Sequence, residues 1–169
     1  MNSTANRRIA IVALIALALD QLTKQIVYRF MSMGQERVII DGFFKFVHWG
    51  NTGAAWSLFM GNNRILAIIA LVALTVLFLS RHHFNAHTTF GQIALGLIFG
   101  GIIGNLIDRI WAKHVIDFIY FYMHRRGADD IGFPAFNIAD SAICIGVGLI
   151  FILSWRNETG MAATAQSSA

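Results

Sequence analysis

The chain has 169 residues, of which 56% are hydrophobic and only 13% are charged. Soluble domains carry about 25% charged residues, so this composition excludes an ordinary water-soluble bundle and indicates a protein surrounded by lipid. The formal net charge is +4, but the basic residues are scattered and form no stripe with interleaved aromatic residues, as nucleic-acid binding would require. We therefore expect membrane lipids, and no nucleic acid, as partners.

Four apolar segments predict membrane-spanning helices in a single integral membrane domain covering residues 1–169. They lie at about residues 9–30, 62–81, 90–109 and 136–156. About 20 helical residues cross a bilayer core of roughly 30 Å. The first segment could instead be a cleavable signal peptide, because Ala16-Leu17-Ala18 matches a cleavage pattern. We favour a retained helix, since apolar residues resume at Ile26. The polar tail, residues 158–169, is expected to be disordered.

The two long connections between these segments predict different structures. In the first, Val38-Ile39-Ile40 is followed by Asp41-Gly42 and then by Phe44, which predicts a strand, a tight turn and a second strand. In the second, aromatic residues such as Phe118 and Tyr120 suit a loop or helix lying in the membrane interface. The fold class is therefore an all-α membrane protein with four transmembrane helices, a small extracytoplasmic β-sheet and an interfacial loop or helix.

Four spans place both termini on one side of the membrane and both long connections on the other. Polar residues at the helix ends and in these connections then fall at one face: Asp20, Lys24, Asn51, Asn105, Asp108, Arg109, Asp117, Asn137 and Asp140.

Basic residues occur at both faces, with more on the side of the long connections. The terminal side has Arg7, Arg8, Arg81 and Arg156, and the other has Arg29, Arg37, Lys45, Arg64, Lys113, Arg125 and Arg126. Since cytoplasmic connections usually carry the excess of Lys and Arg, this count would place the long connections in the cytoplasm.

Ionisable residues within a membrane helix suggest a functional site, because each costs about 2.5–3.5 kcal/mol to insert at the helix centre. Asp20 and Lys24 are four residues apart, so they can neutralise each other on one helical face. They either order helix packing or contact substrate. Asn105, Asp108 and Arg109 form a second cluster after glycines at four-residue spacing. Arg109 can fork onto a carboxylate, although an ion pair that anchors the helix end is the simpler interpretation.

Asp117 and Asp140 have apolar neighbours and no basic partner nearby in sequence. Two carboxylates brought together in a poorly solvated site cannot both ionise, so the pair holds one proton near neutral pH. Aspartic proteolysis uses this state: the charged member takes a proton from the attacking water, and the protonated member donates to the peptide carbonyl oxygen.

Other catalytic classes fit the sequence poorly. It contains six histidines but no H-E-x-x-H motif, and His114 and Asp117 have no third ligand nearby, so we expect no metal. Ser57 and Ser141 have no evident base, and Ser141 is expected to cap or pack.

Motifs in order along nearly the whole chain resemble those of bacterial lipoprotein signal peptidase, the signal peptidase II family of aspartyl proteases. They are DQLTK at residues 20–24, NTGAAWS at 51–57, GGIIGNLIDR at 100–109, VIDF at 115–118 and FNIADS at 136–141. One departure is the stretch 123–133, which is longer and more charged than the family pattern.

The resemblance implies that Asp117 and Asp140 match the catalytic pair of this family, which uses no metal or organic cofactor. It also implies that further residues line or support the site: Asp20, Lys24, Asn51, Gly53, Asn105, Asp108, Arg109 and Asn137. The implied substrate is a lipid-modified prolipoprotein, cleaved before its diacylglyceryl cysteine at the outer face of the cytoplasmic membrane. Both termini would then be cytoplasmic, against the count of basic residues, and we expect a monomer.

Two other classes of protein remain as alternatives. A small transporter or ion-pathway protein also places carboxylates in membrane helices, but residues 65–79 and 143–153, within the second and fourth spans, offer no titratable step with which to continue a path. A non-enzymatic scaffold would explain the glycine face and the surface connections. It leaves the clustered Asn and Asp residues unexplained.

Overall fold

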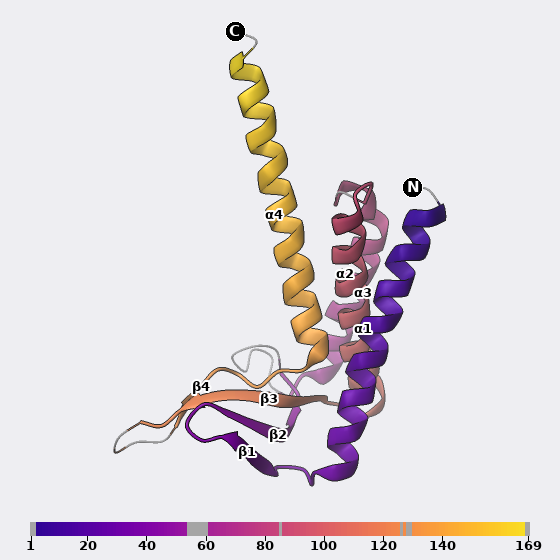
Figure 1. The fold of residues 1–169 in the computed structure, drawn as a ribbon. Helices are drawn as coiled ribbons and strands as arrows, with labels where there is room; N and C mark the ends of the chain where they lie inside the picture. Colours follow the sequence, from indigo (N-terminus) through magenta and orange to yellow (C-terminus); the bar gives the residue numbers. More distant parts are fainter. Residues whose placement is uncertain (1–2, 54–60, 85, 126, 128–129, 168–169) are drawn as a thin grey trace.

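Four long helices stand side by side in this computed structural model, which describes residues 3–53, 61–84, 86–125, 127 and 130–167. They are α1 (Ser3–Phe30), α2 (Asn63–Ser80), α3 (Thr89–Trp111) and α4 (Ile138–Ser167), and a short 3-10 helix, η2 (Arg81–His83), follows α2. All four are long and apolar enough to cross a membrane, which confirms the predicted spans. The N- and C-termini lie at the end opposite the sheet (Figure 1).

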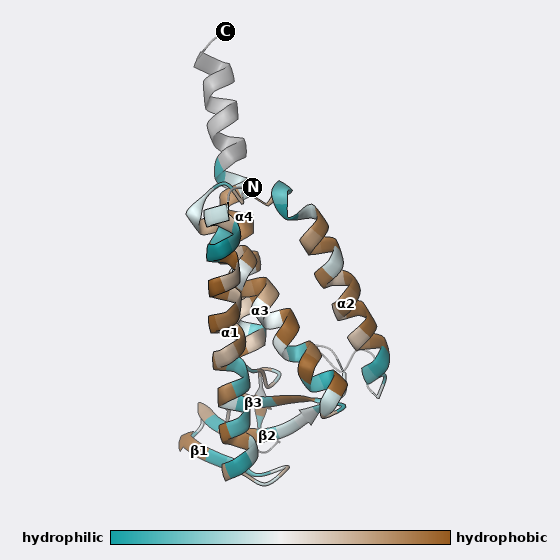
Figure 2. Ribbon diagram, turned by 90° about the vertical axis from the view of Figure 1, so that its right-hand side faces the viewer, coloured by the Kyte–Doolittle hydropathy of each residue, from teal (hydrophilic) through white to brown (hydrophobic). Residues whose placement is uncertain are grey.

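The helices expose apolar side chains along most of their length, as a surrounding of lipid requires. Leu14 of α1, Ile68 of α2 and Phe151 of α4 are each more than 60% exposed. Figure 2 shows this apolar surface along the helices, with hydrophilic residues concentrated toward their ends. In water such side chains would cost about 25 cal/mol per Å² of apolar surface. In a bilayer they carry no such cost.

Helix α3 is the centre of the bundle because glycines let two helices approach it closely. A Cβ atom on Gly100 would lie 2.6 Å from the Ala13 carbonyl oxygen of α1, and one on Gly101 would lie 2.5 Å from the Ala139 carbonyl oxygen of α4. Either distance is shorter than van der Waals contact allows, so the packing requires glycine. The predicted close approach along the glycine face is confirmed.

A four-stranded antiparallel sheet lies at the end of the bundle away from the termini (Figure 1). Its order is β1 (Glu36–Ile40), β2 (Phe44–Asn51), β3 (Val115–Met123) and β4 (Ile131–Gly132). The predicted hairpin is confirmed, since Ile40 pairs with Phe44. Gly42 adopts a φ of 69° in the turn, a left-handed conformation that glycine allows without steric cost.

The second long connection forms strand β3, where the sequence predicts an interfacial loop or helix. β3 pairs with β2, and Trp49 lies opposite Asp117. The aromatic residues suggested an interfacial location, but they suit a strand equally well. Only the partner strand, far away in sequence, decides between these possibilities.

Helix α4 continues to Ser167, and the expected disorder of residues 158–169 stays an untested prediction. Residues 161–167 include three alanines, which are the strongest helix formers. Extending an existing helix avoids the cost of nucleating a new one, so this short polar segment continues α4.

Candidate active site

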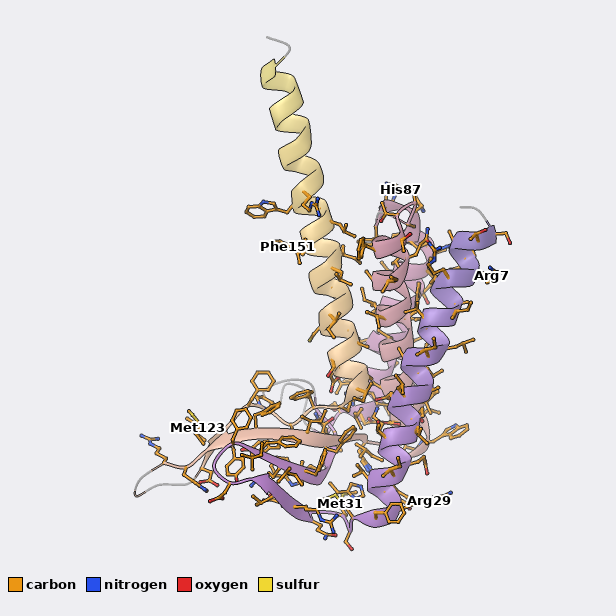
Figure 3. All side chains as sticks on the ribbon, in the orientation of Figure 1. Arg7, Arg29, Met31, His87, Met123 and Phe151 are labelled. Atoms are coloured by element: carbon orange, nitrogen blue, oxygen red, sulfur yellow. The ribbon has the colours of Figure 1, made fainter. Side chains whose placement is uncertain are left out.

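The two long connections and the polar helix ends meet at one end of the bundle, as the count of four spans predicts. In Figure 3, Arg29 and Met31 lie at the sheet end, whereas Arg7 and His87 lie at the end that carries the termini. Of the residues that the sequence analysis names, Ser57, Arg126 and part of the stretch 123–133 (126, 128 and 129) lie outside the part of the chain that the structure describes.

Asp117 is buried on β3, with 3% of its surface exposed, and two asparagine side chains hold it. Asn51 Nδ2, at the end of β2, donates to Asp117 Oδ2 at 2.8 Å. Asn137 Nδ2, just before α4, donates to Asp117 Oδ1 at 2.8 Å. These donors are uncharged, so they fix the carboxyl group in place without forming an ion pair with it.

Asp140 lies in the first turn of α4, where it forms a reciprocal cap with Asn137. The Asn137 backbone N–H donates to Asp140 Oδ2 at 3.2 Å, and the Asp140 N–H donates to Asn137 Oδ1 at 2.9 Å. This is the geometry of a capping box. Asn105 Nδ2 of α3 donates to the other oxygen, Asp140 Oδ1, at 2.7 Å. Asn137 therefore contacts both Asp117 and Asp140.

Burial, and after it the negative charge of Asp140, raise the pKa of Asp117 to about 7, although the hydrogen bonds from Asn51 and Asn137 act to lower it. Near neutral pH, a substantial fraction of Asp117 is thus protonated. Two carboxyl groups that share one proton can act together as acid and base.

A buried cluster of three charged side chains supports the Asp117–Asp140 pair. Lys24 Nζ lies 2.8 Å from Asp20 Oδ2 and 2.8 Å from Asp108 Oδ2, and it donates to Asn105 Oδ1 at 2.9 Å. Lys24 is 1% exposed and Asp20 is fully buried. These contacts join α1 to α3, so the Asp20–Lys24 pair orders helix packing, as one of the two sequence interpretations proposed.

The carboxylates of this cluster also fix the backbone on which the candidate catalytic residues lie. Asp20 Oδ1 accepts the Ala139 N–H at 2.9 Å, at the start of α4. Asp108 Oδ2 accepts the Ile116 N–H at 3.4 Å, next to Asp117. Each carboxylate of the cluster thus positions the residue adjacent to one member of the Asp117–Asp140 pair.

Arg109 makes contacts that differ from those expected. It donates from Nη1 to Asn63 Oδ1 at 3.2 Å and from Nη2 to the Gly53 carbonyl oxygen at 3.0 Å. Among described residues, both acceptors are uncharged, and the ion pair expected to anchor the helix end involves Asp108 with Lys24. Adjacent positions on a helix point about 100° apart, so Asp108 faces α1 while Arg109 faces α2.

Two further contributors were missed at the sequence level. Gln21 Nε2 donates to Asp108 Oδ1 at 3.1 Å and to the Gly104 carbonyl oxygen at 3.2 Å; its place in the DQLTK motif could have indicated it. Asn63 contacts Arg109, and nothing in the sequence signals that role. Ser141, expected to cap or pack, does not cap: its Oγ donates back to the Asn137 carbonyl oxygen, four residues earlier, at 3.0 Å.

No metal site and no cavity in the described part of the chain indicates another reaction centre. Within the described ranges, no group of three or more His, Cys, Asp or Glu side chains could hold a metal ion. An open cavity of about 480 Å³ lies beside the sheet and is lined by residues that include His48, Trp49 and His114. Neither aspartate lines it, so the hydrogen-bonded carboxyl pair is a stronger guide to chemistry than the cavity.

The four apolar helices and the hydrogen-bonded pair of Asp117 and Asp140 are those expected of a multi-pass membrane protein of the aspartic peptidase class. The family model of signal peptidase (SPase) II matches residues 12–156. The chain belongs to this family and is a bacterial membrane peptidase that processes lipoproteins. This membership decides against the transporter and scaffold alternatives.

Relatives and solved structures agree with this assignment. The lipoprotein signal peptidase of Anoxybacillus flavithermus is 35% identical, with 94% of this chain and 93% of the relative covered. That of Symbiobacterium thermophilum is 39% identical, covering 84% and 90%. A solved bacterial membrane enzyme matches with a TM-score of 0.71 and 35% identity, over 89% of this chain and 88% of that one.

Proposed function

We propose that the protein removes the signal peptide from diacylglyceryl-modified prolipoproteins by cleaving before the lipidated cysteine, with Asp117 and Asp140 as the catalytic pair. The observation that carries the pairing is that Asn137 hydrogen-bonds both to the buried carboxyl group of Asp117 and to the half-buried one of Asp140. Family membership supports the substrate class.

In the proposed reaction the two aspartates share one proton. Asp117, whose pKa burial raises to about 7, is the protonated member and donates to the oxygen of the scissile carbonyl. Asp140 is the charged member and accepts a proton from the water that attacks the carbonyl carbon. When the tetrahedral intermediate collapses, the C–N bond breaks, the proton held by Asp140 passes to the leaving amine, and the hydroxyl proton of the intermediate returns to Asp117.

Neighbouring residues keep the two carboxyl groups in place. Asn51, Asn105 and Asn137 donate to them directly, and the Asp20–Lys24–Asp108 cluster fixes the start of α4 and the start of β3. Such preorganisation matters because donors that are already in position need no reorganisation during the reaction. We propose no metal or organic cofactor.

We propose that the monomer lies with both termini in the cytoplasm and its sheet at the outer face of the membrane. The lipid-exposed sides of the helices, such as that of α2 around Ile68, give the acyl chains of the substrate a path to the site within the bilayer.

The test compares Asp117→Asn and Asp140→Asn with Asp41→Asn, purified in detergent and assayed with a diacylglyceryl-modified prolipoprotein. Asp41 is an exposed aspartate in the β1–β2 turn, so its variant controls for loss of a carboxylate elsewhere. We expect both site variants to fold but to leave the substrate unprocessed, and the control to process it. Normal processing by either site variant would contradict the assignment of Asp117 and Asp140 as the catalytic pair.

A further inference from the structure

Helix α2 has the least protein around it of the four spans. Leu66 is the one residue of α2 (Asn63–Ser80) that is buried, and α2 packs chiefly against α3. Figure 2 shows that α2 is apolar along most of its length, and many of its apolar side chains, such as those of Ile68 and Leu79, are exposed. Its position at the active-site end therefore depends on a few polar contacts rather than on an extensive packed interface.

One residue at the start of α2 makes a two-way contact with α3. Asn63 Nδ2 donates to the Arg109 carbonyl oxygen at 2.8 Å, and Arg109 Nη1 donates to Asn63 Oδ1 at 3.2 Å. Both ends of the Asn63 amide are thus bound to a single residue. This fixes the amide orientation and restricts the guanidinium group.

Further hydrogen bonds connect Arg109 to the candidate catalytic pair. Arg109 Nη2 donates to the Gly53 carbonyl oxygen at 3.0 Å, and the Gly53 N–H donates to Asn51 Oδ1 at 2.8 Å. Asn51 Nδ2 then donates to Asp117 Oδ2 at 2.8 Å. Each link holds the group that makes the next one, so the path from Asn63 to Asp117 is continuous.

We propose that Asn63 is a positioning residue for the peptidase reaction, holding Arg109 and, through Gly53 and Asn51, the carboxyl group of Asp117. The inference rests on the proposed function. Asn63 contacts no reacting atom; it ties the lipid-exposed helix α2 to the site. Its loss lets Arg109 and Asn51 move, which weakens the hydrogen bond that Asp117 accepts.

Asn62 provides a matched control, because it is the adjacent asparagine and its side chain makes no capping hydrogen bond among the described residues. We expect Asn63→Leu, which is similar in size, to lower kcat about threefold to tenfold with little change in KM, in line with the loss of one or two hydrogen bonds. Asn62→Leu keeps wild-type kinetics.

The pH profile separates positioning from a purely structural role. The Asn51 hydrogen bond lowers the pKa of Asp117, so weakening this bond raises that pKa. Because Asp117 acts as the protonated member of the pair, the peptidase activity is lost as the pH rises through the pKa of Asp117. The basic limb of the profile therefore moves to higher pH in Asn63→Leu, whereas a role in stability alone would leave the limb unchanged.

Two more variants keep the test decisive if Asn63→Leu folds poorly. Asn63→Asp retains the acceptor for Arg109 Nη1 but loses the donor to the Arg109 carbonyl oxygen, so we expect it to recover part of the kcat that Asn63→Leu loses. In an Arg109→Lys background, Asn63→Leu should add little further loss, because the two residues act in series.

Several results would overturn the inference: equal effects of the Asn62 and Asn63 variants, an unmoved basic limb, no recovery in Asn63→Asp, or losses that multiply with Arg109→Lys. Failure of the wild-type protein to cleave the lipid-modified substrate would overturn the proposed function, and this inference with it. That outcome is distinct, because it is measured before any variant.

Discussion

The two halves of α3 are held by opposite kinds of interaction. Toward the termini, Gly96 and Gly100 bring α3 into close van der Waals contact with the backbone and small apolar side chains of α1. Toward the sheet, Asn105, Asp108 and Arg109 make hydrogen bonds and ion pairs to three other elements. Apolar packing tolerates small shifts, whereas polar contacts fix specific atoms. The apolar half therefore assembles the bundle, and the polar half orients the site.

The largest expected effect comes from removing the cation of the polar half. Lys24→Met keeps the length of the side chain but leaves Asp20 and Asp108 buried without their shared partner. Breaking a buried ion pair in this way costs about 3–5 kcal/mol. We expect a large drop in Tm in detergent.

A second substitution checks the cause of that drop. Adding Asp108→Asn to Lys24→Met removes one of the uncompensated charges, so part of the lost stability should return. An unchanged Tm in Lys24→Met would mean that polar contacts do not hold this half of α3.

A smaller effect is expected in the apolar half. Gly100→Ala places a Cβ atom 2.6 Å from the Ala13 carbonyl oxygen, so α1 must shift, at a cost of about 1–3 kcal/mol for overpacking. Gly148→Ala is the matched control, because a Cβ there meets nothing within 4 Å. Thermal unfolding should show a lower Tm for Gly100→Ala only. Equal values for the two variants would contradict the close contact.

The smallest effect concerns an exposed ion cluster at the tip of the sheet, which contrasts with the buried one. His124 Nε2 lies 3.1 Å from Asp41 and its Nδ1 lies 2.9 Å from Asp130. The hydrogen bond to Asp130, followed by that to Asp41, raises the pKa of His124, so its stabilising contribution is present below about pH 6.5 and is lost as pH rises through the raised pKa.

We expect this contribution to be slight and to be screened by salt, because solvent surrounds these groups. His124→Gln should remove the corresponding pH dependence of Tm while leaving peptidase activity unchanged. A pH effect on Tm that is as large in His124→Gln as in wild type would assign it to other groups.

Local patterns predicted most of the fold. Runs of apolar residues predicted the four spans, and the turn residues Asp41 and Gly42 predicted the hairpin. β3 was mistaken for an interfacial loop or helix because its aromatic residues suit both environments, and its pairing partner β2 lies more than 60 residues earlier.

The site was predictable as a set of residues but not as a set of contacts. Spacing indicated the Asp20–Lys24 pair, and the family motifs indicated Asp117 and Asp140. The partners of Arg109 were not predictable, because they depend on which face of α3 meets α2. Asn63 had no signal at all, since its role arises only when the two helices lie together.

The sequence by itself determined that the chain spans the membrane four times and that its polar residues gather at one face. The length of each apolar segment, its hydropathy and the even number of spans can all be read along the chain. Only the tertiary structure decided that Asn137 contacts both Asp117 and Asp140, and that Lys24 bridges Asp20 and Asp108. It also decided that a path of hydrogen bonds connects Asn63 to Asp117. These contacts join residues far apart in sequence, and a hydrogen bond forms only when donor and acceptor lie within about 3 Å.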